Sequence, residues 1–375
     1  MKPLTIEQIE LHLIEMPLVH PFETSFGRET VRPCILVSVA SAGLIGWGEC
    51  VAGSGPWYTP ETVQTAWHVL RDYLIGMVLG QQIRAPQEVP ELVARVRGHA
   101  MARAALENAI WDLVAQAQGV SLATLLGGTR AAVPVGVSVG LEPTIAALLE
   151  QVEGFVARGY QRVKLKIKPG HDVQLVRAVR ERYPDLLLQV DANSAYTLAD
   201  TAVFKELDAY QLLLIEQPLH HDDLVDHATL QHELHTPICL DESIQSPEHA
   251  RWALQLGACR VINIKVGRVG GFTAAMAIHD LCAAQGVPVW CGGMLETNIG
   301  RAGNLALASK ANFTLPGDIS ESVRYFAQDV ALPNLTLNAD STITVPDEVG
   351  LGVTLDAERL AAVRQQHLVV RASGA

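Results

Sequence analysis

The sequence predicts an α/β fold: a (β/α)7β-type, TIM-like barrel with an α+β capping domain built from the N-terminal segment and the C-terminal tail. Three observations support this. The first part of the chain has strand-like alternation followed by helical patterns. After residue 128, a short β-rich run and an amphipathic segment recur at intervals of roughly 25 residues. Polar residues end several of these runs at the same interval.

The N-terminal segment, residues 1–128, predicts an antiparallel meander followed by helices. Apolar residues at 9, 11 and 13 alternate with Glu10 and His12, and apolar runs at 34–39 and 44–47 flank an Ala-Gly turn. The pattern is helical from about 62 to 126. It is clearest at 101–117, where Leu106, Ile110 and Leu113 form one stripe. We expect this unit to form the N-terminal part of the cap.

The middle segment, residues 129–325, predicts the barrel. Its β-rich runs lie at 134–140, 163–167, 186–190, 212–215, 238–240, 261–264, 287–290 and 313–315. Such a repeat requires parallel strands joined by right-handed crossovers. An open doubly wound sheet also fits the repeat, but eight units without a Gly-rich phosphate fingerprint favour a closed barrel. The segment at 326–375 is not needed for the eighth strand, so we expect it to return to the cap.

Composition restricts the partners. The 375 residues include 28 Lys and Arg against 40 Asp and Glu, a formal net charge of −12, which disfavours nucleic acid and anionic membranes as partners. We expect a small-molecule substrate. The sequence has no apolar stretch of membrane-spanning length and no signal-peptide pattern, which predicts a cytoplasmic protein. Six cysteines without a C-x-x-C pair predict free buried thiols.

Ionisable residues end five neighbouring strands of the predicted barrel. These residues recur at intervals of 24 or 25 positions from Lys166 onward. They are Lys164 and Lys166 on the second strand, Asp191 on the third, Glu216 on the fourth, Asp241 on the fifth and Lys265 on the sixth. The carboxyl ends of barrel strands face the active-site mouth, so these side chains should meet there. Taken singly, Asp191 could cap a helix or make a turn, and Glu242 beside Asp241 is an alternative ligand. Recurrence on three successive strands favours a shared site.

The three carboxylates predict a metal site. Carboxylates that converge on adjacent strand ends repel one another and require protons or a cation. All the candidate ligands are oxygen atoms, without a nearby His pair or Cys cluster, which favours Mg²⁺ or Mn²⁺ over zinc.

The lysines predict proton transfer. Alternation along 163–168 places the apolar residues against the helices and Lys164, Lys166 and Lys168 toward the barrel. A run of lysines is commonly a solvated face, but here carboxylates follow on the next strands. Lys265 ends the sixth strand, which lies opposite the second in a barrel of eight. A reacting carbon between Lys166 and Lys265 could be approached from either side.

The strand-end motifs resemble those of the enolase superfamily, in its muconate-lactonising subgroup. They are Lys-Leu-Lys at 164–166, Asp-Ala-Asn at 191–193, Glu-Gln-Pro at 216–218, Asp-Glu-Ser at 241–243 and Lys-Val-Gly-Arg-Val-Gly-Gly at 265–271. Segments 105–113 and 125–128 resemble the family's cap helix and its link to the barrel. Within the subgroup, the chain is most similar to the N-acylamino acid racemase and o-succinylbenzoate synthase family.

The resemblance implies roles for these residues. Asp191, Glu216 and Asp241 would bind Mg²⁺, with Mn²⁺ or Co²⁺ as substitutes. Lys166 and Lys265 would be the acid/base pair that acts on the carbon beside a substrate carboxylate, and Lys164 would be an auxiliary cation. The resemblance also implies a symmetric homo-oligomer, such as an octamer.

Departures from related patterns narrow the activity. The seventh strand ends without a catalytic His, which disfavours a mandelate-racemase-like arrangement. Asp318-Ile319-Ser320 replaces the Asp-x-Asp with which dipeptide epimerases hold a free ammonium, so an acylated nitrogen is favoured. The leading hypothesis is therefore an N-acylamino acid racemase. The alternatives are an o-succinylbenzoate synthase, as a second activity or the main one, and a non-catalytic metal-binding scaffold.

Specificity should come from aromatic loops of the cap and from the strand ends. Phe22 with Phe26, and Trp57 with Tyr58, could close over an apolar side chain or could equally be cap core. Ser138 could face the acyl group. Arg268 could tune Lys265 or form a structural salt bridge. The expected substrate-binding residues are Phe22, Trp57, Tyr58, Ser138, Asn193, Gly293, Met294 and Asp318, with Arg268 and Glu242 supporting the site from behind.

Overall fold

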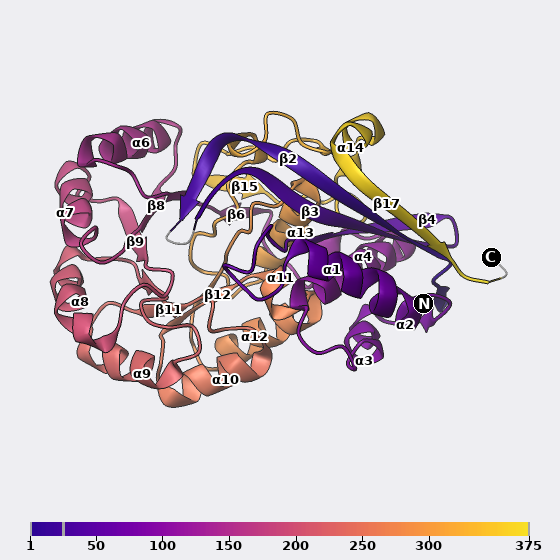
Figure 1. The fold of residues 1–375 in the computed structure, drawn as a ribbon, viewed down its shortest axis with the longest axis horizontal. Coiled ribbons are helices and arrows are strands. Elements are labelled where there is room, and N and C mark those ends of the chain that lie inside the picture. Colours follow the sequence, from indigo (N-terminus) through magenta and orange to yellow (C-terminus); the bar gives the residue numbers. More distant parts are fainter. Residues whose placement is uncertain (1, 25–26, 374–375) are drawn as a thin grey trace.

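The computed structural model describes residues 2–24 and 27–373 and contains a curled parallel sheet surrounded by helices, with a strand-rich cap on one side (Figure 1). Seven parallel strands form the sheet in the order β13-β12-β11-β10-β9-β8-β7. They are β7 (Val137–Val139), β8 (Arg162–Lys166), β9 (Leu187–Asp191), β10 (Ile215–Glu216), β11 (Ile238–Leu240), β12 (Val261–Ile264) and β13 (Val289–Cys291). Spatial order follows chain order without a reversal, which excludes the doubly wound alternative.

A helical segment follows each strand and covers the outside of the sheet. In Figure 1, α6 to α10 form an arc around it. The helices are α6 (Ile145–Ala157), α7 (Val173–Arg182), α8 (Thr201–Leu207), α9 (Leu224–Glu233), α10 (Pro247–Leu256), α11 (Val266–Val269), α12 (Phe272–Ala284) and α13 (Asn298–Ala308). Local sequence sets their ends: the Ser246 side chain caps α10 ahead of Pro247, and Gly257 ends it with a φ of 68°.

The eighth predicted strand, at 313–315, is reduced to single bridges. Phe313 bridges to Val289, and Gly317 bridges to Val135. Pro316 has no N–H for a ladder, and its carbonyl accepts from Arg162 Nη2 at 3.0 Å, whereas the Gly317 carbonyl accepts both from Arg162 Nη2 at 2.6 Å and from Gly136 N at 2.8 Å. The segment still closes the sheet between β13 and β7, so the architecture holds while the regular strand is lost.

The first predicted barrel strand, at 134–140, is also divided. Only β7 joins the barrel sheet, whereas β6 (Ala132–Pro134) pairs antiparallel with β15 (Thr342–Thr344) of the C-terminal segment. Two further strands of that segment, β14 (Ala331–Leu332) and β16 (Thr354–Leu355), pair with each other and precede α14 (Ala357–Val363).

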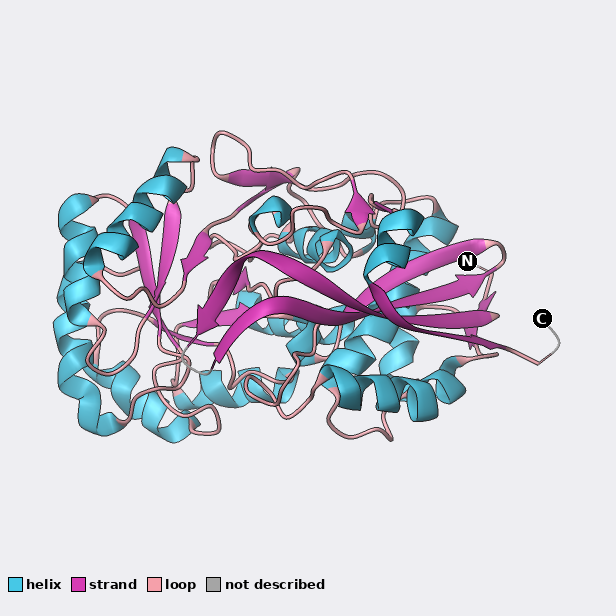
Figure 2. Ribbon diagram, turned by 45° about the horizontal axis from the view of Figure 1, so that its top comes forward, coloured by secondary structure: helices cyan, strands magenta, loops and turns pink. Residues whose placement is uncertain are grey.

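The cap contains a four-stranded antiparallel sheet in the order β17-β2-β3-β4. Its long strands reach over the barrel (Figure 2). They are β2 (Gln8–Thr24), β3 (Gly27–Ser41), β4 (Leu44–Cys50) and β17 (Arg364–Arg371). The remaining cap elements are β1 (Leu4–Thr5), β5 (Gln82–Ile83), α1 (Val63–Val69), α2 (Ile75–Val78), α3 (Val89–Leu92), α4 (Ala100–Gln118) and α5 (Leu122–Leu125). Because β17 pairs with β2, the tail returns to the cap. The boundaries at 128 and 325 stay predictions.

Buried carboxyl groups of the cap hold the barrel helices. Glu49 accepts hydrogen bonds from Thr297 N at 3.1 Å and Gly300 N at 3.0 Å at the start of α13, and Glu107 accepts from Thr273 N at 3.0 Å at the start of α12. Burial outweighs these hydrogen bonds and raises the pKa of Glu49 and of Glu107 to about 7. Such contacts fix the cap above the strand ends.

Two sequence predictions concern the chain as a whole. All six cysteines are buried and free, which confirms the reading of their spacing. Among the described residues, no helix combines the length and apolar character needed to cross a membrane.

Candidate active site

A cavity of about 260 Å³ lies where the cap meets the barrel strand ends. Its lining contains every residue that the sequence predicted for substrate contact, together with the three lysines: Phe22, Trp57, Tyr58, Ser138, Lys164, Lys166, Asn193, Lys265, Gly293, Met294 and Asp318. The aromatic residues therefore face the cavity, and the Trp57 side chain is largely exposed there. Phe26 lies outside the described residues. Lys168 lies past the end of β8 and is exposed, so its predicted inward orientation is wrong.

Strand register places two of the predicted carboxylates and two lysines side by side. Lys166 pairs with Asp191 across β8 and β9, and Asp191 pairs with Glu216 across β9 and β10. Lys164 Nζ lies 3.2 Å from Asp191 Oδ2 and 2.9 Å from Glu216 Oε2. Lys166 Nζ lies 2.6 Å from Asp191 Oδ2. Both carboxylates are buried and share one ammonium group.

The third predicted carboxylate, Asp241, follows β11 and faces a different set of cations. Lys265 Nζ lies 2.9 Å from Asp241 Oδ2, and the Arg268 guanidinium pairs closely with Asp241 Oδ1. Tyr58 Oη donates to the same carboxylate at 3.1 Å, and the Lys265 ammonium lies 4.5 Å from the centre of the Tyr58 ring. The cap thus contributes Tyr58 directly to the base of the site.

Arg268 is buried and all its hydrogen-bond partners are within the fold. Beyond Asp241, Nη1 donates to Tyr58 Oη at 3.0 Å, Nε to the Ile244 carbonyl at 2.7 Å, and Nη2 to the Asn263 carbonyl at 2.6 Å. Two roles were expected for Arg268, tuning Lys265 or forming a structural salt bridge. These contacts favour the salt bridge, because they hold the guanidinium where it can position Asp241.

Asn193 and Glu242 connect the two halves of the site. Asn193 Oδ1 accepts from Lys166 Nζ at 2.7 Å, while its Nδ2 donates to Glu242 Oε1 at 2.9 Å. Asn193 adopts a left-handed φ of 42°, which asparagine tolerates better than most residues. Burial raises the pKa of Glu242, and the nearby Asp191 carboxylate raises it further. The Glu242 side chain thus contacts Asn193, the residue that also accepts a hydrogen bond from Lys166.

Asp318 neutralises two buried cations. Its carboxylate lies 2.6 Å from Lys164 Nζ and 2.6 Å from Arg162 Nη1. Burial alone would raise the pKa of Asp318, but Arg162 and Lys164 prevail and hold it well below its usual range. Burial likewise lowers the pKa of Lys164, whereas Asp318, Glu216 and Asp191 raise it and prevail. The three carboxylates therefore favour the ammonium form of Lys164.

The chemistry of the three carboxylates fits a hard divalent cation, since buried carboxylate oxygens on adjacent strand ends are ligands that Mg²⁺ accepts. The carboxylate oxygens of Asp191, Glu216 and Asp241 do not all lie within 4.8 Å of one another. Within 2–24 and 27–373, the groups of His, Cys, Asp and Glu whose ligand atoms lie within 4.8 Å of one another are elsewhere. In this structure ammonium and guanidinium groups neutralise the carboxylates, and a bound cation would take over part of that charge balance.

Sequence reasoning missed four residues near the site. Asn263 Nδ2 donates to Glu216 Oε1 at 2.9 Å, and Arg162 pairs with Asp318. Each lies two residues before a predicted lysine on the same strand, so strand alternation could have identified both. Arg28 and Arg32 of β3 also line the cavity, but no local pattern marks them.

Comparisons with known proteins show the family of the chain. Residues 147–359 match the model of the enolase C-terminal domain-like family, and residues 8–127 match the mandelate racemase/muconate lactonizing enzyme N-terminal domain. The chain is 50% identical over 363 residues to an o-succinylbenzoate synthase of Geobacillus kaustophilus, covering 96% of each protein. It is 50% identical over 356 residues to an N-succinylamino acid racemase of an Amycolatopsis species, covering 95% of this chain and 96% of that one.

A solved structure shows the same likeness. A member of the enolase superfamily from Listeria innocua superposes with a TM-score of 0.95 at 42% identity, covering 98% of this chain and 99% of that one. Together, the two matched domains, the full-length relatives and the shared architecture identify the chain as a member of the enolase superfamily, in its muconate-lactonising subgroup.

Proposed function

We propose that the protein is a Mg²⁺-dependent N-acylamino acid racemase. The observation that supports this best is the placement of Lys166 and Lys265 in one cavity. They belong to β8 and to the end of β12, and three strands of the sheet separate these two. A substrate carbon held between them has one amine on each face.

The chemistry to be assisted is the loss of a proton from a carbon beside a carboxylate. One lysine would remove the α-proton and the other would return a proton to the opposite face, which inverts the stereocentre. A divalent cation held by Asp191, Glu216 and Asp241 would stabilise the negative charge that develops on the substrate carboxylate. Lys164, whose ammonium form the neighbouring carboxylates favour and which lines the cavity, would stabilise the same charge.

A lysine that acts as a base must be neutral. Burial is the strongest influence on Lys265 and lowers its pKa, but Tyr58, Glu216 and Glu242 raise it and prevail in this structure. Neutralising Glu216 and Glu242 would remove two of the three influences that raise the pKa of Lys265 and so favour the free amine. The pKa of Lys265 therefore depends on the charges of the neighbouring groups in the site.

The substrate nitrogen should be acylated. Asp318, the acidic residue nearest the motif that holds a free ammonium in dipeptide epimerases, is already paired with Lys164 and Arg162. Ser138 Oγ is buried at the cavity wall without a hydrogen-bond partner, so it is available to an amide. Because the Asp318 carboxylate is already paired with two cations, it is not free to bind the ammonium group of an unacylated substrate.

We propose further that the acyl group is a succinyl group. The names of both relatives, o-succinylbenzoate synthase and N-succinylamino acid racemase, contain it. Arg28 and Arg32 line the cavity on the cap side, where a second substrate carboxylate would find positive charge. Arg28 is exposed, whereas Arg32 is buried and donates to the Val51 carbonyl.

The alternative function, o-succinylbenzoate synthesis, is favoured by relatives at 50% identity that carry that name. The same lysines could serve a syn dehydration, with one as base and then acid while the other stabilises the intermediate. Both activities can share one site.

The test supplies Mg²⁺ with N-succinyl- and N-acetylmethionine in deuterated buffer, and separately with the cyclohexadiene carboxylate precursor of o-succinylbenzoate. The racemase proposal expects loss of optical rotation together with exchange of the α-proton, faster for the succinyl substrate. Dehydration without α-proton exchange of either amino acid would instead establish the synthase as the function. If Mg²⁺ supports turnover of none of these three compounds, the remaining hypothesis is the non-catalytic metal-binding scaffold.

A further inference from the structure

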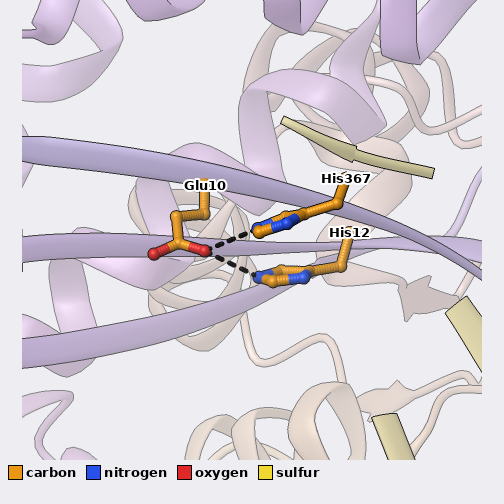
Figure 3. A group of neighbouring side chains, drawn as sticks. All are labelled: Glu10, His12 and His367. Atoms are coloured by element: carbon orange, nitrogen blue, oxygen red, sulfur yellow. Dashed lines mark hydrogen bonds and ion pairs between the residues drawn. The ribbon is translucent and has the colours of Figure 1, made fainter. Parts of the chain in front are cut away.

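A second group of metal-ligand side chains lies on the outer face of the cap sheet, away from the cavity. Glu10 and His12 project from the same face of β2, two residues apart, and His367 projects from β17 (Figure 3). His12 and His367 are direct partners in the antiparallel register. The ligand atoms of the three residues all lie within 4.8 Å of one another.

One carboxylate oxygen is the meeting point of this group. Glu10 Oε2 lies 2.7 Å from His367 Nε2 and 3.5 Å from His12 Nε2. Dashed lines mark these two contacts in Figure 3. The other oxygen, Oε1, accepts from Gln8 Nε2 at 2.6 Å. Gln8 therefore orients the carboxylate so that Oε2 faces both imidazoles, as an outer partner of a metal ligand commonly does.

His12 supplies an independent indication of a ligand. Its side chain is 5% exposed, yet neither ring nitrogen has a hydrogen-bond partner. The ring lies between His367, stacked at 4.5 Å between centroids, and Trp47, at 5.6 Å. Buried polar atoms normally have partners, and His12 Nε2 lies 3.5 Å from Glu10 Oε2 without forming a hydrogen bond. A cation between these atoms would satisfy it.

We propose that Glu10, His12 and His367 form a binding site for a transition-metal dication such as Zn²⁺. Two imidazoles and one carboxylate are a ligand set typical of zinc and its neighbours, whereas Mg²⁺ prefers oxygen alone. An ordinary histidine has a pKa near 6.5, so the imidazoles can coordinate at neutral pH. With three protein ligands, a fourth position stays open to water.

The site would join the two ends of the chain. Its ligands come from β2 near the start of the sequence and from β17 at its end, so a bound ion would fasten the C-terminal strand to the cap sheet. An ion bound only to the folded state raises the stability of that state. This role is separate from the reaction in the barrel and does not depend on it.

The experiment uses the full-length protein, stripped with a chelator and then kept in saturating Mg²⁺. Zn²⁺ binding is measured by calorimetry, Co²⁺ binding by its visible absorption, and the midpoint of thermal unfolding is recorded with and without Zn²⁺. The site variants are His367→Gln and Glu10→Gln, both at partly exposed positions, so each tests the site if the other fails to fold. The matched control is His221→Gln, which alters the exposed group His220, His221 and Asp222.

The proposal expects the wild type and His221→Gln to bind one more equivalent of Zn²⁺ than the site variants. Loss of an outer partner alone costs about 10–100-fold in metal affinity, so each site variant should lose at least about tenfold. Zn²⁺ should raise the unfolding midpoint of the wild type and the control but not of the site variants. Equal stoichiometry and affinity in wild type and site variants, or loss confined to His221→Gln, would overturn the proposal.

Discussion

Replacing Arg268 tests whether this residue positions Asp241 or tunes Lys265. In Arg268→Met, Asp241 keeps Lys265 and Tyr58 as partners but loses the guanidinium, and the carbonyls of Ile244 and Asn263 lose their donors. Removing one member of a buried ion pair costs about 3–5 kcal/mol. We expect the free energy of unfolding to fall by that amount.

Arg268→Lys refines the estimate, because lysine keeps the charge but cannot reproduce the planar set of donors. At least one of the two carbonyls stays unsatisfied, at a cost of about 1–3 kcal/mol. Urea denaturation of both variants measures these losses, and Arg251→Met, at an exposed position on α10, is the control with an expected change near zero. An unchanged unfolding free energy in Arg268→Met, together with a shifted pH dependence of racemisation, would refute the positioning role and support tuning of Lys265.

Three further predictions concern the cap, the metal ligands and the cavity wall. The pKa of Glu49 rises from 4.5 to about 7 on folding, so Glu49 contributes to the free energy of unfolding below pH 4.5 and this contribution is lost as pH increases through 7. Glu49→Gln should remove this pH-dependent loss, which amounts to up to about 3 kcal/mol in unfolding curves measured across this pH range. Asp241→Asn should weaken Mg²⁺ binding, measured by calorimetry, more than Glu242→Gln does, and the reverse order would make Glu242 the ligand. Gly293→Ala places Cβ 2.5 Å from the Asp318 carbonyl oxygen, so the free energy of unfolding measured by urea denaturation should fall by about 1–3 kcal/mol.

The regular repeat explains why the sequence predicted the barrel and its strand-end residues. Each strand of a parallel barrel presents its carboxyl end to the same mouth, so a polar residue placed after each apolar run needs no long-range information to be located. Lys166, Asp191 and Glu216 were found in this way, and the register pairs them directly.

What the sequence could not predict depends on contacts between distant segments. Nothing in 313–315 shows that the Arg162 guanidinium donates to the carbonyls of Pro316 and Gly317, just after the predicted eighth strand. Asp318 was expected to face substrate, and its pairing with Lys164 depends on the closure of the barrel. His367 reaches His12 only through the pairing of β17 with β2, a separation that local periodicity does not encode.

The most direct test of the central claim follows the α-proton of each enantiomer separately. Lys166→Ala and Lys265→Ala are incubated with Mg²⁺ and D- or L-N-succinylmethionine in deuterated buffer, and exchange is measured by NMR. The two-sided arrangement predicts that neither variant racemises, that each exchanges one enantiomer only, and that the two variants exchange opposite enantiomers. Exchange of the same enantiomer by both variants, or racemisation by either one, would contradict it.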